Sequence, residues 1–251
     1  MKIIHLSDLH FHRNNKDNKE ALVTLKNVNA KYPDHYVVIT GDIVDDGHEK
    51  QYENAFMALK PFKGRIFIAP GNHDFGVLGN LYSYERARRF DDMLSIPLEQ
   101  GGTFLTENRP VVNIVGNGND SVMFIALDTN LETEQPFDFA CGEVGKFQLN
   151  ALSNILDSPT IPGMKKILFF HHHPFILNDP FMELKDAKKL ARVIYNKVDV
   201  VLFGHKHEMG KWVKRWGTEF ILASDNSPEK NKAGEITIKN VVVKMKYVNL
   251  K

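Results

Sequence analysis

The sequence from Lys2 to His10 reads KIIHLSDLH, and the sequence from Tyr36 to Asp42 reads YVVITGD. Each stretch is a short apolar, β-branched run that ends abruptly in polar residues, as a buried strand does at its carboxyl end. Arg65 to Ala69, Lys166 to Phe170 and Asp199 to Phe203 repeat this pattern. Helical patterns lie between the runs, and this alternation is typical of an α/β protein with a largely parallel central sheet.

Five further runs are strand candidates: Val111 to Val115, Val122 to Leu127, Glu219 to Ala223, Glu235 to Ile238 and Val241 to Val248. The first two are expected to form a hairpin across residues 116–120, and the last two a second hairpin. Apolar residues at helical spacing predict helices over Tyr52 to Leu59 and Ala187 to Ile194, with weaker patterns through Ala21 to Val28 and Leu149 to Leu156. Ten strands fit two sheets packed face to face. We therefore expect a four-layer α/β/β/α sandwich of two mixed sheets flanked by helices.

The composition excludes several classes of protein. Of the 251 residues, 43% are hydrophobic and 25% are charged, which are ordinary values for a soluble globular chain. Lys and Arg number 32 against 31 Asp and Glu, so no global positive field draws the chain to nucleic acid or to anionic lipid. The longest apolar run, Val122 to Leu127, is far too short to span a membrane.

No repeat or linker marks a domain boundary, so residues 1–251 are expected to form a single domain. The amino terminus turns polar too soon for the apolar region of a signal peptide. The single cysteine, Cys141, has no partner for an internal disulfide. These features predict a cytoplasmic protein.

Five polar clusters each follow a predicted strand. They are Asp8-Leu9-His10, Gly41-Asp42, Gly71-Asn72-His73-Asp74, His171-His172-His173-Pro174 and Gly204-His205-Lys206-His207. Seven of the eleven histidines fall in these clusters, whereas surface histidines would be scattered over helices and loops. Because ligand sites in open α/β sheets collect beyond the carboxyl ends of strands, the five clusters are expected to meet at one crevice.

The residue types in these clusters predict a catalytic metal site. Carboxylate, imidazole and amide donors without cysteine suit Mn, Fe, Co or Zn. Residues two apart in an extended chain point the same way, so Asp8 with His10, and His205 with His207, can each face one metal region. The candidate donors are Asp8, His10, Asp42, Asn72, one clustered histidine, His205 and His207, enough for two metals that share one carboxylate. Two metals about 3.5 to 4 Å apart lower the pKa of bound water towards about 7, which supplies hydroxide for attack on phosphorus.

The ordered motifs Asp-x-His, Gly-Asp, Gly-Asn-His-Asp, His-x-Pro and Gly-His-x-His resemble those of the calcineurin-like metallophosphoesterases from Asp8 to His207. The resemblance implies the metallophosphoesterase fold and two metal ions. It assigns Asp8, His10 and His207 to one metal, Asn72, His172 and His205 to the other, and Asp42 to both. His172 is chosen because it opens the motif that ends at Pro174. His73 would stabilise the transition state or protonate the leaving oxygen, and the Asp45 carboxylate would orient His73.

Two stretches resemble the cyclic-nucleotide phosphodiesterase branch of this superfamily. They are Gly41 to Gly47, with Tyr52 shortly after, and Gly145 to Leu152. Asp46 stands where Ser/Thr protein phosphatases of the superfamily carry arginine, which argues against that activity. Phe75-Gly76 follows the Gly-Asn-His-Asp motif, where the cyclic-nucleotide branch often has a basic residue.

The leading hypothesis is therefore a metallophosphodiesterase acting on a small phosphoester such as a nucleotide. A phosphomonoesterase or a nucleotide pyrophosphatase could use the same metals, because the pocket walls determine the substrate. A DNA nuclease is disfavoured by the near-zero net charge. A non-catalytic scaffold is disfavoured because every motif position is occupied. The oligomeric state stays open.

The histidines outside this ligand set are assigned structural places. His5 lies within a strand and is expected to be a core or hydrogen-bonded residue. His12 is expected in an exposed loop. Alternation along an extended segment is expected to aim His171 and His173 away from His172 and so away from the metals.

Overall fold

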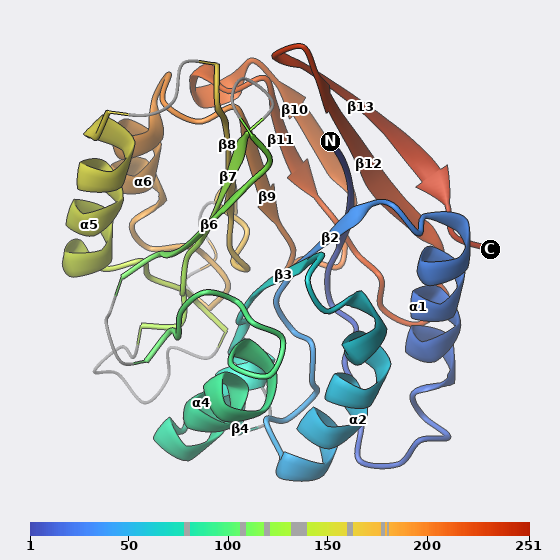
Figure 1. Cartoon of the computed structure of the whole chain (residues 1–251). Helices are drawn as coiled ribbons and strands as arrows, with labels where there is room; N and C mark the ends of the chain where they lie inside the picture. The colour runs from blue at the N-terminus through green and yellow to red at the C-terminus, as the bar shows by residue number, and fades with distance from the viewer. Residues whose placement is uncertain are drawn as a thin grey trace.

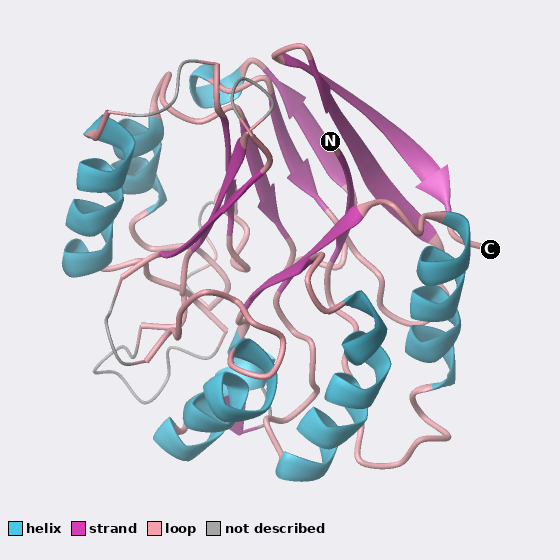
Figure 2. Ribbon diagram, in the orientation of Figure 1, coloured by secondary structure: helices cyan, strands magenta, loops and turns pink. Residues whose placement is uncertain are grey.

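A computed structural model shows two β-sheets packed face to face, with helices on the outer side of each (Figure 1, Figure 2). It describes residues 1–77, 81–105, 109–117, 121–131, 140–159, 163–176, 179 and 181–251. The predicted four-layer architecture is confirmed.

The first sheet has the strand order β13-β12-β1-β2-β3. Its strands are β1 (Lys2–Leu6), β2 (Tyr36–Thr40), β3 (Ile66–Ala69), β12 (Lys232–Lys239) and β13 (Val242–Asn249). The first three run parallel, and β12 pairs antiparallel with both β1 and β13. Helix α1 (Lys19–Lys31) connects β1 to β2, and α2 (Glu49–Leu59) with the short η1 (Lys60–Phe62) connects β2 to β3.

The second sheet has the order β10-β11-β9-β8-β7-β6. Its strands are β6 (Val111–Val115), β7 (Val122–Ala126), β8 (Lys165–Phe169), β9 (Val200–Phe203), β10 (Gly210–Val213) and β11 (Phe220–Ala223). The edge strands β6 and β10 are antiparallel to their neighbours, and the inner four are parallel. Helices α5 (Lys146–Asp157) and α6 (Ala187–Ile194) lie on the same outer side of this sheet (Figure 1).

A run of short elements follows β3. It comprises α3 (Asn72–Phe75), the two-stranded pair β4 (Gly76–Val77) and β5 (Leu81–Tyr82), α4 (Tyr84–Phe90) and the π-helical η2 (Asp91–Ser95). A short η4 (Arg215–Gly217) lies between β10 and β11. The ten predicted strands and four predicted helices are present, whereas β4, β5 and β10 were not predicted. In the predicted β6–β7 turn, residues 118–120 lie outside the described residues.

The apolar residues form two cores. One surrounds the first sheet and includes residues of the second sheet that face it, so that Phe67 of β3 stacks on Phe124 of β7 at 4.3 Å between ring centroids. The other lies between the second sheet and helices α5 and α6. Successive residues of the β8 segment alternate between the two cores, because side chains of a strand point to opposite faces in turn.

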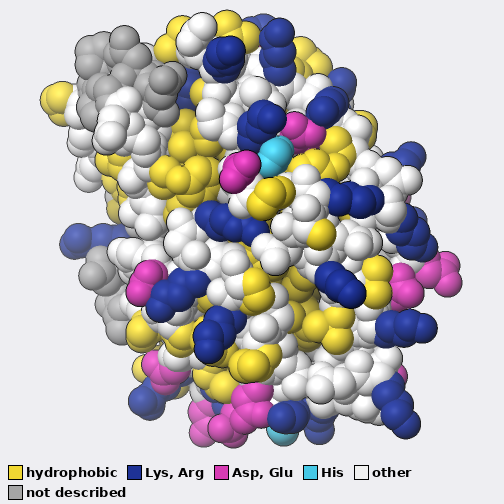
Figure 3. Space-filling model, turned by 45° about the vertical axis from the view of Figure 1, so that its right-hand side comes forward, with side chains coloured by type: hydrophobic (Ala, Val, Ile, Leu, Met, Phe, Trp, Pro, Cys, Tyr) yellow, Lys and Arg dark blue, Asp and Glu magenta, His cyan; other side chains and the backbone are white. Residues whose placement is uncertain are grey.

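The surface agrees with the balanced composition. On the face drawn in Figure 3, Lys and Arg side chains are spread out, with acidic and apolar side chains among them. None of the described helices is long and apolar enough to cross a membrane.

Candidate metal centre

The polar clusters lie where the parallel strands of both sheets end (Figure 1). Five of their donor residues have a left-handed backbone: Asp8 (φ 59°), His10 (46°), Asp42 (50°), His205 (79°) and His207 (51°). Non-glycine residues rarely adopt this conformation, and such strain concentrates at functional sites. Gly41 is needed for close approach as well, since a Cβ there would lie 2.6 Å from His171 Nδ1.

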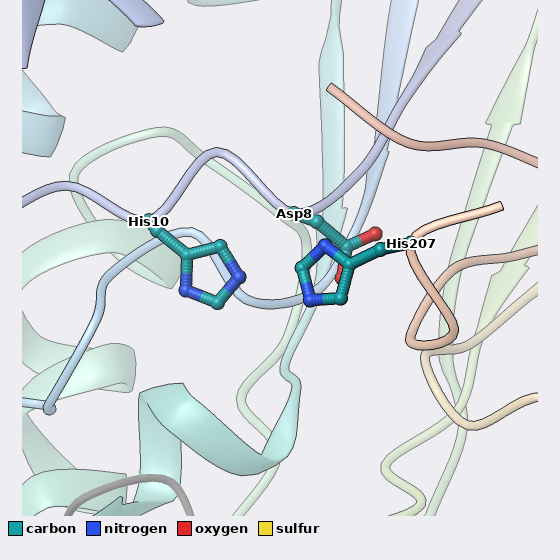
Figure 4. A group of neighbouring side chains, drawn as sticks. All are labelled: Asp8, His10 and His207. Carbon is teal, nitrogen blue, oxygen red and sulfur yellow. The ribbon is translucent and has the colours of Figure 1, made fainter. Parts of the chain in front are cut away.

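One constellation joins the end of β1 to the loop after β9. Donor atoms of Asp8, His10 and His207 lie within 4.8 Å of one another, and Figure 4 shows the three side chains pointing towards a common space. The His10 and His207 rings are stacked, with centroids 5.4 Å apart. Asp42 lies beside this group, with its Oδ2 3.9 Å from His10 Nε2.

A second constellation centres on His171. Its Nε2 is 3.2 Å from Asp42 Oδ2, 3.1 Å from Asn72 Oδ1 and 3.2 Å from His205 Nδ1. Ligand atoms about 2.0 to 2.1 Å from one metal ion are separated from each other by roughly 3 to 3.4 Å, so these spacings match the edges of a coordination shell. His171 Nδ1 donates to the Thr40 carbonyl at 2.8 Å, so the ring in its neutral form, the form that binds a metal, has its lone pair on Nε2.

His171 thus occupies a place that the sequence analysis did not give it. The expectation that it faces away from the metals is wrong, because it contacts Asp42, Asn72 and His205 directly. His172 was assigned the ligand position, but its Nδ1 contacts Thr129 Oγ1 at 2.7 Å, and its buried Nε2 has no hydrogen-bond partner among the described residues. The ligand role of His172 stays a prediction.

His73 and Asp45 are in contact, through other atoms than expected. The His73 main-chain N–H donates to Asp42 Oδ1 at 3.0 Å, and its Nδ1 donates to the Asp45 carbonyl oxygen at 2.7 Å. The Asp45 carboxylate instead lies 3.2 Å from His12 Nδ1 and 3.8 Å from His10 Nδ1. The orienting contact is therefore made by the main chain of Asp45, and its side chain faces His10 and His12.

Two of the three remaining expectations for histidines are confirmed, and the third, His12, lies in a loop as expected but is only partly exposed. His5 is fully buried within β1 and bonds to Thr40 Oγ1 at 3.0 Å. His173 packs against the rings of Phe203 and Trp212.

Burial and charge set the protonation states of the donors, and His171 is the one that must lose a proton before it can bind a metal. Burial lowers the pKa of His10 to about 4 and that of His205 to about 3, so both rings are neutral at pH 7 and can offer lone pairs. Burial acts to lower the pKa of His171 too, but the charges of Asp42 and Asp8 raise it to about 9. Burial raises the pKa of Asp8 to about 6. Burial would also raise the pKa of Asp42, but His171 and His73 hold it well below its usual value.

The residues present fit divalent cations. In the part of the chain that the structure describes, Asp8 Oδ2 and the ring nitrogens of His10 are buried without a hydrogen-bond partner. Buried polar atoms of this kind are costly unless something compensates them, and a cation does so. The positive charge of protonated His171 compensates the negative charges of the buried Asp8 and Asp42. A bound divalent cation can supply this positive charge instead.

Asp225 is a site residue that the sequence analysis missed. It is 1% exposed, lies two residues after the end of β11, and its Oδ1 lies 3.6 Å from His207 Nδ1. The signal was available, because Asp225 follows a predicted strand just as Asp8 and Asp42 do.

Comparison with known proteins identifies the family. Residues 1–209 match the calcineurin-like phosphoesterase family. The chain belongs to this family. It is therefore an enzyme that hydrolyses phosphoester bonds, in agreement with the donor atoms gathered at the strand ends. The predicted membership of the calcineurin-like phosphoesterases is confirmed.

Relatives of this phosphoesterase include a probable cyclic nucleotide phosphodiesterase of Coxiella burnetii, 30% identical over 82% of this chain and 76% of the relative. A 3',5'-cyclic adenosine monophosphate phosphodiesterase of Haemophilus influenzae is 24% identical over 68% of this chain and 54% of the relative. Among solved structures, a dimetal phosphatase from Danio rerio superposes with a TM-score of 0.69 at 15% identity, over 100% of this chain and 96% of that chain. This last likeness shows the fold.

Proposed function

We propose that this phosphoesterase is a dinuclear metal-dependent phosphodiesterase that opens the phosphodiester ring of 3',5'-cyclic nucleotides. The main support for two ions is that His171 Nε2 lies 3.1 to 3.2 Å from donor atoms of Asp42, Asn72 and His205. This group lies next to the group formed by Asp8, His10 and His207. The relatives named as cyclic nucleotide phosphodiesterases support this choice of substrate.

The proposed ligands divide between two ions. Asp8, His10 and His207 would hold one ion, and Asn72, His171 and His205 the other. Asp42 would bridge, since its carboxylate faces both His10 and His171. His171 here takes the place that the sequence motif gave to His172. When bound, two divalent ions supply Lewis acidity towards the phosphoryl oxygens and lower the pKa of water.

His73 is the proposed general acid. Its Nδ1–H is engaged by the Asp45 carbonyl, so Nε2 is the atom left to face the substrate. In the imidazolium form Nε2 carries the proton that the leaving alkoxide needs. The main-chain bond from His73 to Asp42 holds this ring at a fixed place beside the ligands. General acid catalysis of this kind is typically worth about 10² to 10⁴ in rate.

The test begins with protein stripped by a chelator and then given Mn²⁺. We expect hydrolysis of bis-p-nitrophenyl phosphate to exceed that of p-nitrophenyl phosphate, and 3',5'-cyclic AMP to be converted to a nucleoside monophosphate by addition of one water. Faster hydrolysis of the monoester would contradict the proposal and favour a phosphomonoesterase. Diester hydrolysis without turnover of cyclic nucleotides would keep the reaction class and reject the substrate.

A His73→Ala variant tests the general acid. We expect kcat on cyclic AMP to fall by about 10² to 10⁴ while the variant still binds metal. Because His73 is not a proposed ligand, loss of metal along with activity would contradict its assignment. Full activity in this variant would contradict it as well.

A further inference from the structure

His207, a proposed metal ligand, lies on an exposed loop. It lies between β9 and β10, is 45% exposed at its side chain and has a left-handed backbone. An exposed side chain can adopt several rotamers, so fixing it in the one that binds an ion costs conformational entropy. Its Nδ1 faces Asp225 Oδ1 at 3.6 Å, and the Asp225 side chain is only 1% exposed. An exposed donor is thus in contact with a buried carboxylate.

The Asp225 carboxylate is held in place by its own segment. The main-chain N–H and the hydroxyl of Ser227 both donate to Asp225 Oδ1, at 3.0 and 2.6 Å. Lys230 Nζ lies 4.0 Å from Oδ2. The residues on either side of Asp225 are bonded to the β1 segment: Ser224 Oγ donates to the His5 carbonyl, and Asn226 exchanges two bonds with the Ser7 main chain. Since β1 leads directly into Asp8, the backbone fixes Asp225 relative to that ligand.

The charge of Asp225 selects one form of the His207 ring. A carboxylate only accepts hydrogen bonds, so it favours the tautomer that carries its proton on Nδ1. The lone pair is then on Nε2, which is the nitrogen required for metal binding. Histidine ligands commonly have such a carboxylate behind them, and its removal costs about 10- to 100-fold in metal affinity or activity.

We propose that Asp225 is a positioning residue of the metal centre, which fixes the tautomer and ring orientation of His207 for one of the two ions. This inference rests on the proposed dinuclear site. It predicts that loss of the Asp225 charge weakens the binding of one ion and not of the other, because Asp225 contacts a ligand of only one of them.

The test is Asp225→Asn in the full chain. Asparagine keeps the size and an oxygen that can accept from Ser227, but it lacks the charge. Metal-stripped proteins are titrated with Mn²⁺ by calorimetry, and we expect wild type to bind two ions. In the variant, one ion is expected to bind about 10- to 100-fold more weakly and the other unchanged. The thermal midpoint of the metal-free protein is expected to stay the same.

Two further variants separate positioning from folding. Asp186→Asn is the matched control, because Asp186 is a buried carboxylate too and lies outside the proposed site. It accepts two hydrogen bonds as Asp225 does, here from the main-chain N–H groups of Val144 and Gly145. It is expected to bind both ions as wild type does. In a His207→Ala background, Asp225→Asn is expected to weaken metal binding no further, since the two residues act through one contact.

Unchanged affinities in Asp225→Asn would overturn the inference. Equally weaker binding of both ions, together with a lower thermal midpoint of the metal-free protein, would indicate a folding role and would overturn it too. A further loss of metal affinity on adding Asp225→Asn to His207→Ala would have the same consequence. Failure of wild type to bind two ions would contradict the proposed dinuclear site itself, so the two failures can be told apart.

Discussion

Two adjacent histidines at the end of β8 lie in different surroundings. Phe169 belongs to the core around the first sheet, and Phe170 belongs to the core beneath α5 and α6. Side chains two apart share a side of an extended segment, so His171 follows Phe169 towards Asp42 and His172 follows Phe170 away from it. The sequence motif was counted back from Pro174. Counting forward from the buried strand would have favoured His171.

The two histidines can be compared directly by alanine substitution. His171→Ala is expected to weaken one of the two ions by more than about 100-fold, beyond the loss that removal of an outer partner causes. His172→Ala is expected to retain both ions, because its Nδ1 contacts Thr129 Oγ1 and its ring packs against His205 at 4.6 Å between centroids, outside the group of donor atoms around His171 Nε2. Calorimetric titration with Mn²⁺ gives both affinities, and circular dichroism checks that each variant is folded. If His172→Ala loses an ion and His171→Ala does not, the assignment of His172 as the ligand, made from the sequence motif, would be restored.

Among the elements, prediction succeeded where burial produces a pattern. The residues of β2 and β3 are nearly all buried, and their continuous apolar runs were recognisable. Strand β10 has the sequence GKWV and alternates between half-buried and exposed residues, so it owes its conformation to pairing with β11. The two-residue strands β4 and β5 likewise adopt the strand conformation because they pair with each other. Tertiary pairing of this kind leaves too weak a pattern in the sequence to be predicted.

Strand β1 carries a buried titratable group that gives the fold a dependence on pH. Burial lowers the pKa of His5 to about 3, whereas the same residue in the unfolded chain titrates near 6.5. Between these values the unfolded chain binds one more proton at this position, so stability is lost as the pH falls from about 6.5 towards 3. His5 alone contributes a slope of about 1.4 kcal/mol per pH unit over this window.

His5→Gln tests this element, because glutamine does not titrate and can still bond to the Thr40 hydroxyl. We expect the free energy of unfolding to fall by about 2 to 3 kcal/mol more in wild type than in the variant between pH 6 and pH 4. Urea unfolding at each pH gives the values, and contributions from all other groups cancel in the difference. Parallel pH curves for the two proteins would show that His5 is protonated in the folded state.

At the scale of the whole molecule, the proposed metal centre lies at the carboxyl ends of strands from both sheets. Asp8, Asp42 and Asn72 follow strands of the first sheet, and His171, His205 and His207 follow strands of the second. The sequence predicted this convergence because it depends only on which residues end parallel strands. The contact between Asp225 and His207 depends on the path of two loops, and no rule for strand ends provides that. The single-domain organisation of residues 1–251 stays a prediction.

Ligands drawn from both sheets should make metal binding a source of global stability. An ion that binds only the folded chain, at about 1,000 times its dissociation constant, stabilises it by about 4 kcal/mol. For a chain of this size that corresponds to a rise of roughly 8 to 16 °C in the thermal midpoint. We expect a chelator to remove this increment from wild type and from Asp186→Asn. Asp42→Asn should show little of it, because Asp42 faces the donors of both ions. A wild-type midpoint that the chelator does not move would mean that the metals do not couple the two sheets.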